Sequence, residues 1–180
     1  LDAPVARTRD AAEAGTLSVM VGGDTDAFTR AHPILTCIAS DITHCGASGH
    51  GQVFKILNNM VLFQTVQALA EALAIGERSG IDPKQLFDTF SKGSADSFAL
   101  RNHGMKALLP RHFPLRAFST IYAQKDNACA LELAAQVGVD ACGARLMAQV
   151  FEDAIGRGQG DAYFPVIYRR LLPLSEFGEA

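Results

Sequence analysis

The sequence predicts a mainly helical protein in which a short α/β segment, residues 1–48, precedes an all-helical part, residues 49–180. A short apolar run closed by two glycines indicates a buried strand in the first segment. An apolar stretch over residues 52–78 is typical of the central helix of a bundle. Every segment after this stretch has a helical pattern, so we place the boundary at residues 46–51, before the long helix.

The α/β segment contains two predicted strands with a helix between them. Leu17–Val21 is the apolar run, and either Asp24 or Thr25 can cap the helix that follows it. Pro33 is expected to bend or end the first part of this helix. A second strand is predicted over Ser40–His44. The apolar stripe of the helix consists of Phe28, Ala31, Ile34 and Leu35.

The helical part begins with a long helix over about residues 52–78, which the pair Ser79-Gly80 ends. Asp82, followed by proline and then by Gln85 at the third helical position, forms a capping box and predicts a new helix. The remaining helices are expected at residues 94–101, 117–137, 142–157 and 161–172.

Composition narrows the class of protein. Hydrophobic residues make up 48% of the chain, charged residues 19%, and the formal net charge is −3, so we expect no nucleic-acid partner and no basic membrane-surface patch. Polar residues interrupt the most apolar stretch, residues 53–75, and argue against a membrane span. The four cysteines form no C-x-x-C pair, and the scattered histidines lack metal-ligand spacing. We therefore expect reduced thiols, no metal site and a cytoplasmic location.

The chain opens on Leu-Asp-Ala-Pro-Val, a strand-like start with neither an initiator methionine nor a basic leader. We therefore expect that an upstream part of the protein is missing from this sequence. The glycine-rich fingerprint G-x-G-x-x-G, which binds the pyrophosphate of a dinucleotide, does not occur in the 180 residues.

The most informative stretch is the glycine-rich bend Gly46–Gly51, which leads directly into the long helix. Such a bend lets the backbone approach a ligand closely, with amide N–H groups pointing outward. Lys55 and Asn59 are four residues apart, so they share one helical face about one turn apart. An ammonium and an amide there predict a polar cleft, and the helix end together with partial burial would lower the pKa of the lysine. The alternative is a solvated lysine beside amides that serve helix packing.

This stretch has the pattern G-x-x-G-x-G-x-x-x-K-x-x-x-N, which resembles the catalytic signature of the β-hydroxyacid dehydrogenases. The resemblance extends over most of the chain, in the right order. The other stretches that carry it are Asp2-Ala3-Pro4-Val5 with Gly15-Thr16-Leu17 and Val21-Gly22-Gly23, then Lys125-Asp126, and then Gly156–Asp161. It implies the end of a Rossmann-like NAD(P)-binding domain over residues 1–48. It also implies an all-helical, 6-phosphogluconate dehydrogenase-like substrate and dimerisation domain over residues 49–180.

The resemblance also implies roles for matching residues. Lys55 would be the general acid/base that exchanges a proton with the substrate oxygen, and Asn59 would orient that oxygen or the acid group. Asn58 would line the site or serve packing. Lys125 would lie beside the nicotinamide of NAD or NADP; its alternative is a surface ion pair with Asp126. Self-association as a homodimer or homotetramer is expected.

The sequence departs from the family after Asp2–Val5, where family members usually continue with Ser-Gly-Gly and this chain has Ala6-Arg7-Thr8. The Pro-Val-x-Arg-Thr form is similar to that of sulfolactaldehyde reductase. A guanidinium is a planar fork suited to carboxylate, sulfonate or phosphate, so Arg7 and Thr8 are expected to hold the anionic end of a small hydroxy acid or aldehyde. The alternative for Arg7 is a surface arginine in a loop. Tyr163 stands where the family often has Asp.

Two functional hypotheses follow. In the first, the protein transfers a hydride between NAD(P) and a small 3-hydroxy acid or its semialdehyde. In the second, the 180 residues are a helical dimerisation fragment that is inactive because the main anchor of the cofactor is absent.

Overall fold

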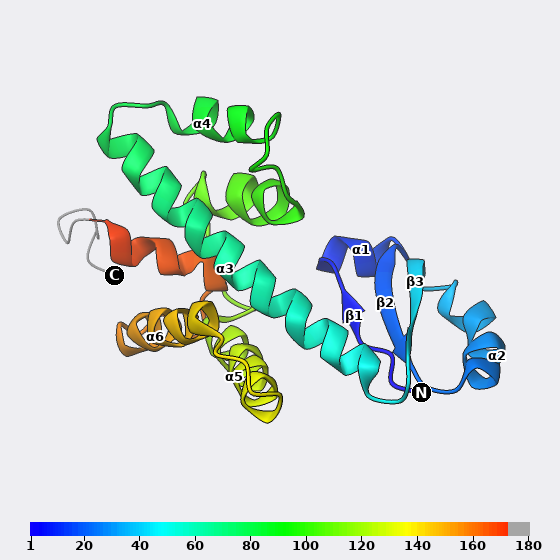
Figure 1. Ribbon diagram of the computed structural model, residues 1–180. Coiled ribbons are helices and arrows are strands. Elements are labelled where there is room, and N and C mark those ends of the chain that lie inside the picture. Colours follow the sequence, from blue (N-terminus) through cyan, green and yellow to red (C-terminus); the bar gives the residue numbers. More distant parts are fainter. Residues whose placement is uncertain (173–180) are drawn as a thin grey trace. The chain divides into compact units, whose positions relative to one another are not determined.

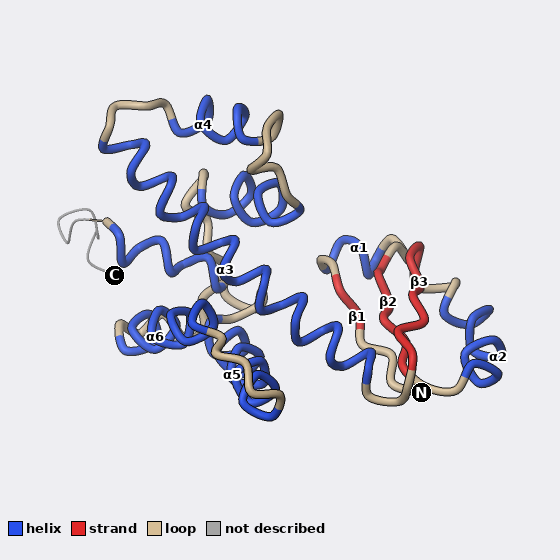
Figure 2. Tube along the Cα trace, in the orientation of Figure 1, coloured by secondary structure: helices blue, strands red, loops and turns tan. Residues whose placement is uncertain are grey.

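The computed structural model describes residues 1–172, which are mainly helical with one small sheet (Figures 1 and 2). The predicted fold class is thereby confirmed. The chain divides into two compact units, of which the first is Leu1–Asn59 and the second begins at Met60. The division falls within the helix α3 (His50–Arg78), so the first turns of this helix belong to the sheet-containing unit.

The first unit is built on a three-stranded sheet of order β1-β2-β3. Strand β1 (Val5–Ala6) pairs antiparallel with β2 (Leu17–Gly22), which pairs parallel with β3 (Ala39–Gly46). Both predicted strands are therefore present, the second extended by one residue at its start and two at its end. The apolar run of β2 supplies most of a small core that contains Val19, Val21 and Ala39.

Two helices complete the first unit, and side chains cap both. The hydroxyl oxygen of Thr8 accepts the amide of Ala11 at 3.4 Å and starts the short helix α1 (Arg9–Glu13), which the sequence analysis did not predict. An Asp24 carboxylate oxygen accepts the amide of Ala27 at 2.8 Å and starts α2 (Thr25–Leu35), as the cap signal indicated. Pro33 lies inside α2, which ends two residues later, as expected.

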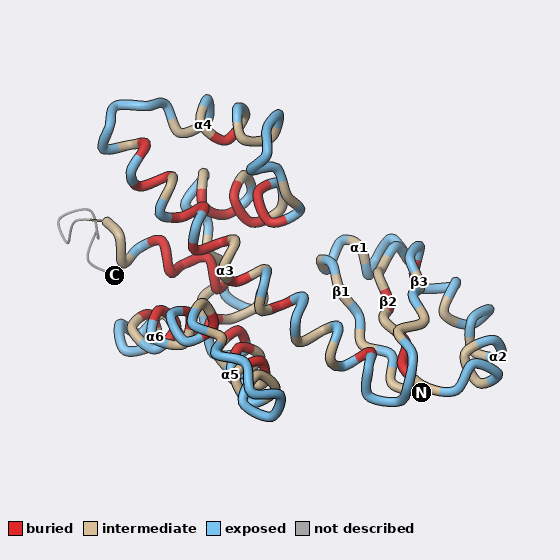
Figure 3. The backbone as a smooth tube through the Cα atoms, in the orientation of Figure 1, coloured by how far each residue is buried: buried red, intermediate tan, exposed pale blue. Residues whose placement is uncertain are grey.

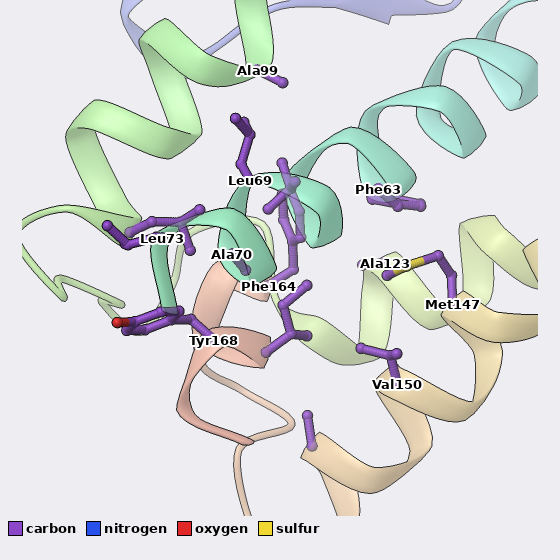
Figure 4. Packing of buried hydrophobic residues seen from close by; sticks show 14 of the residues in the cluster. Phe63, Leu69, Ala70, Leu73, Ala99, Ala123, Met147, Val150, Phe164 and Tyr168 are labelled. Carbon is purple, nitrogen blue, oxygen red and sulfur yellow. The ribbon is translucent and has the colours of Figure 1, made fainter. Parts of the chain in front are cut away.

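The second unit is a helical assembly around the rest of α3, whose buried stretches are visible in Figure 3. It contains α4 (Pro83–Phe90), the π-helix η1 (Leu100–Leu108), α5 (Thr120–Gln136), α6 (Cys142–Gly156) and the 3-10 helix η2 (Phe164–Leu171). The core joins apolar side chains of α3 to those of the other elements, as Figure 4 shows. Phe63 lies at its centre, with ring centroids 5.3 Å from those of both Phe151 and Phe164.

Two predicted helices differ from the observed elements. The helix expected at 94–101 begins only at Phe98, because the hydroxyl of Ser97 accepts the amide of Leu100 at 3.0 Å; it then continues as the π-helix η1. The helix expected at 161–172 is the shorter 3-10 helix η2. The cap predicted at Asp82 is confirmed, since a carboxylate oxygen of Asp82 accepts the amide of Gln85 at 2.7 Å.

Within residues 1–172, no helix is long and apolar enough to cross a membrane. Helix α3 is long enough to span a membrane, but it is not apolar enough, because polar side chains such as Gln67 and Glu71 interrupt it. These two side chains lie one turn apart, and the amide nitrogen of Gln67 donates to the Glu71 carboxylate at 2.7 Å.

Candidate active site

The two residues at the centre of the predicted site lie in the first three turns of α3. Lys55 is half-buried and Asn59 retains only 2% of its accessible surface. The helix is continuous through both positions, so the ammonium and the amide have the one-turn spacing that the sequence predicted. The neighbouring Asn58 is exposed, and its amide nitrogen donates to the side-chain oxygen of Asn59 at 3.1 Å. Asn58 thus holds the orientation of the buried amide.

The glycine-rich bend approaches the end of β2 very closely. A side-chain carbon added at Gly22 would lie 2.8 Å from the amide nitrogen of Gly51, and one added at Gly51 would lie 3.0 Å from the amide nitrogen of Gly22. A carbon at Gly51 would lie still closer to the carbonyl oxygen of Met20, and side-chain carbons essentially never come as close to backbone as 2.8 Å, so both positions require glycine. The glycines therefore fix where α3 starts and, as a consequence, how far from the end of β2 Lys55 and Asn59 lie along the helix.

The outward-pointing amides of this bend bind a side chain of the protein itself. The carboxylate of Asp2 accepts the amide of Gly49 at 2.7 Å and that of Gln52 at 3.0 Å, so it caps α3 from the start of the chain. These amide hydrogen bonds, led by that of Gly49, lower the pKa of Asp2. The sequence analysis expected these amides to face a ligand. In the structure, the Asp2 carboxylate occupies two of them.

Arg7 has a backbone conformation that favours glycine, with φ at +86°. Its guanidinium donates to the Asp41 carboxylate at 2.6 Å, to the hydroxyl of Ser40 at 2.9 Å and to the carbonyl of Thr16 at 2.7 Å. Hydrogen bonds from Ser40 and then Arg7 lower the pKa of Asp41. The fork thus ties the turn after β1 to the starts of β2 and β3, and Asp41 supplies the anion that it holds in this structure.

Thr8, the other residue expected at the anionic end of the substrate, is half-buried and caps α1. Its hydroxyl oxygen is the acceptor in that cap, as described above. The structure thus gives both Arg7 and Thr8 partners within the first unit, and their contact with a substrate stays a prediction.

Lys125 lies in the second unit, on the second turn of α5. Its side chain is 64% exposed and its ammonium nitrogen lies 3.0 Å from the carboxylate of Asp126. The hydrogen bond and the charge of Asp126 raise the pKa of Lys125, which is therefore protonated at neutral pH. An exposed ammonium held by one neighbour is compatible with both the predicted cofactor contact and the alternative of a surface ion pair.

The sequence analysis missed one polar pair in the second unit. The phenol oxygen of Tyr163 lies 2.5 Å from Nδ1 of His103, which is buried on η1 with 6% of its surface exposed. No local signal joins these residues, because they are 60 positions apart. Within residues 1–172, no group of three or more histidine, cysteine, aspartate or glutamate side chains could hold a metal ion.

Two family models match the chain, and together they cover most of it. The model described as NAD-binding of NADP-dependent 3-hydroxyisobutyrate dehydrogenase matches residues 49–171. The model described as the NAD binding domain of 6-phosphogluconate dehydrogenase matches residues 1–46.

Individual relatives agree with these models. A probable 3-hydroxyisobutyrate dehydrogenase of Mycobacterium tuberculosis is 37% identical over 146 residues, which is 78% of this chain and 50% of the relative. The 2-(hydroxymethyl)glutarate dehydrogenase of Eubacterium barkeri is 34% identical over 163 residues, which is 89% of this chain and 54% of the relative. The chain therefore spans about half the length of the curated relatives it matches.

Solved structures show the same fold. The M. tuberculosis 3-hydroxyisobutyrate dehydrogenase with L-serine superposes with a TM-score of 0.84 at 31% identity, covering 96% of this chain and 60% of the other. A 3-hydroxyisobutyrate dehydrogenase from Salmonella typhimurium gives 0.85 at 25% identity, covering 94% and 59%. Because a family model matches more than half of the residues and the catalytic-signature pattern stands at the start of α3, this chain belongs to the β-hydroxyacid dehydrogenase family.

Proposed function

We propose that this protein is an NAD(P)-dependent oxidoreductase of small 3-hydroxy acids or their semialdehydes, with Lys55 as the general acid/base. The observation that carries the proposal is the pair Lys55 and Asn59 on one face of α3, half-buried and buried respectively, at the helix start fixed by Gly22 and Gly51. A buried amide and a partly buried ammonium on an apolar helix need polar partners, and a polar ligand can be one of them.

The division of labour between these residues follows from their chemistry. The ammonium of Lys55 would give a proton to the substrate oxygen during reduction, and the neutral amine would take it back during oxidation. Asn59 offers both a donor and an acceptor, which can orient the same oxygen or the substrate's acid group. Because the hydrogen bond from Asn58 already fixes the amide of Asn59, little side-chain entropy is left to lose on binding.

NAD or NADP would supply or accept the hydride when bound. The described residues fit one part of such a cofactor, since the exposed, protonated Lys125 can donate hydrogen bonds to its polar groups. The glycine-rich fingerprint for the pyrophosphate does not occur in the 180 residues, so the proposal assigns no residue of this chain to that part of the cofactor. The NADP+ complex among the structural neighbours shares the fold at 23% identity.

The anionic end of the substrate is assigned to Arg7 and Thr8. A carboxylate, sulfonate or phosphate of the substrate can bind the guanidinium of Arg7 only if it replaces the carboxylate of Asp41. Arg7 and Asp41 form an exposed ion pair. Exposed ion pairs contribute little net free energy, on the order of 1 kcal/mol or less, so a substrate anion can compete for the fork. The hydroxyl of Thr8 can donate to such an anion while its oxygen continues to cap α1.

Self-association as a homodimer or homotetramer belongs to the same proposal. Several large apolar side chains of the second unit are more than half exposed, among them Val61, Ile75, Leu115 and Tyr122. Apolar surface of this kind is typical of sites where protein chains associate. Sedimentation of the purified protein measures the state directly. The proposal also places the protein in the cytoplasm, in keeping with its four free cysteines.

The decisive experiment is Lys55→Ala in the full-length protein, assayed with short hydroxy acids and aldehydes. Loss of a general acid/base lowers kcat by about 10²–10⁴-fold. Lys92→Ala, which removes an exposed lysine of the second unit, is the matched control and is expected to keep wild-type turnover. Unchanged turnover in Lys55→Ala would eliminate the proposed acid/base role.

A further inference from the structure

The start of α5 is fastened to a distant segment by backbone hydrogen bonds. The amide of Thr120 donates to the carbonyl of Ala162 at 3.0 Å, and the amide of Ile121 donates to the carbonyl of Gly160 at 3.1 Å. The hydroxyl of Thr120 adds a third bond to Ala162 at 3.1 Å. The segment 160–164 therefore satisfies amides in the first turn of α5 that the helix itself leaves without partners.

The contact between these segments is tight. A side-chain carbon added at Gly160 would lie 2.9 Å from Cδ1 of Ile121, so the buried glycine leaves room for the Ile121 side chain. Three residues after Gly160, Tyr163 pairs with Ser119, the residue that caps α5. Tyr163 thus lies at the point where the 160–164 segment and the start of α5 are joined.

Tyr163 also reaches a third element. Its phenol oxygen lies 2.5 Å from Nδ1 of His103 on η1, and the His103 ring contacts Phe164 in a tilted arrangement at a centroid distance of 5.3 Å. Burial lowers the pKa of His103 to about 4 and raises that of Tyr163 to about 12. Both groups are therefore neutral between these values, and their hydrogen bond persists over the whole range in which the enzyme would work.

The element that carries His103 is unusual. Helix η1 is a π-helix, a form that is rare and occurs frequently at functional sites. It packs Gly104 against Phe87 and Leu100, since a side-chain carbon there would meet each at 3.2 Å. This packing fixes η1 in the core of the second unit, which makes His103 a rigid anchor for the phenol.

We propose that Tyr163 and His103 are positioning residues whose hydrogen bond fixes the start of α5 and thereby the place of Lys125 beside the cofactor. Lys125 lies five residues after Thr120, the first residue of α5, so a shift or loosening of the first turn moves the ammonium. The inference rests on the proposed function, because it takes the cofactor contact of Lys125 from there.

The test is Tyr163→Phe, which removes one hydroxyl and keeps the ring contacts. Hydrogen exchange of the Thr120 and Ile121 amides, measured in this chain, is expected to become about five-fold faster, the effect of losing one ordinary hydrogen bond. In the full-length enzyme, the KM for the cofactor is expected to rise about five-fold while kcat stays within about two-fold. His103→Asn keeps a polar group near the place of Nδ1, so it is expected to show smaller changes than Tyr163→Phe.

The matched control is Tyr168→Phe. Tyr168 is a buried tyrosine of the second unit, and its hydroxyl donates to Glu77 rather than to the η1 histidine. This variant should lose a similar amount of stability while leaving both the amide exchange at the start of α5 and the KM for the cofactor unchanged. A Tyr163→Phe protein that behaves like Tyr168→Phe in either measurement overturns the proposal. The proposed function is tested separately: it fails if the Lys55→Ala protein keeps wild-type turnover, whatever the Tyr163→Phe variant shows.

Discussion

Acidification should destabilise the second unit through His103. Burial is the main cause that lowers the pKa of this histidine from 6.5 to about 4, and the positive charge of Lys106 adds to it. Between pH 6.5 and about 4, His103 is protonated in the unfolded chain and neutral in the folded chain. Stability is therefore complete above about pH 6.5 and falls as the pH drops toward 4. At about 1.4 kcal/mol per tenfold change in proton affinity, the loss across this range is about 3 kcal/mol.

The assay is urea denaturation of the wild type and His103→Asn at several pH values between 7.5 and 4. Between pH 7.5 and 4, protonation of His103 should lower the unfolding free energy of the wild type by about 3 kcal/mol. The variant has no histidine at this position, so its unfolding free energy should lack this pH dependence. The carboxylates whose pKa is lowered, such as Asp2 and Asp96, contribute stability that is lost only below about pH 4, and they are common to both proteins. Parallel stability curves for the two proteins, or a His103 resonance that titrates near pH 6.5, would refute the reasoning.

Three further outcomes are expected. Gly51→Ala should lower the free energy of unfolding, measured by denaturation, by about 1–3 kcal/mol, because the added carbon would lie 2.6 Å from the Asp2 carboxylate. The control Gly156→Ala should not lower it, because no atom lies within 4 Å of the added carbon. Arg7→Gly should raise the KM for an anionic aldehyde at least about ten-fold in a steady-state assay, and an unchanged KM removes Arg7 from the substrate site. By calorimetry the 180-residue chain alone should bind NAD(P) weakly, since the sequence lacks a pyrophosphate fingerprint; tight binding contradicts this.

Local signals were sufficient wherever one short segment decides its own structure. The caps at Asp24 and Asp82 are correct because a side chain three residues before an amide needs no distant partner. The long helix α3 follows from its length and apolar content, and its start follows from the glycine bend. The spacing of Lys55 and Asn59 on one face follows from helix geometry alone.

Local signals failed where the partner is far away in the chain. The helical segment before η1 is capped by Ser97, and nothing in the local sequence favours Ser97 over Ser94 as the cap. The π-helix that follows depends on packing against Phe87, which belongs to another helix. The amides of the glycine bend looked available for a ligand, because nothing local indicates that Asp2 would cap them. The ion pair of Arg7 with Asp41 could not be foreseen either, because the two residues are 34 positions apart; the substrate contact of Arg7 stays a prediction.

The sequence by itself therefore determined the fold class, the main helices, the family pattern and the spacing of the residues proposed for catalysis. These depend on periodicity, capping and glycine content, which act over a few residues. The tertiary structure decided which charged and polar groups meet: Asp2 with the bend, Arg7 with Asp41, and Tyr163 with His103. Such pairs form only when packing brings distant segments within about 3 Å; hydrogen bonds then keep Asp2 and Asp41 charged, whereas burial keeps His103 and Tyr163 neutral.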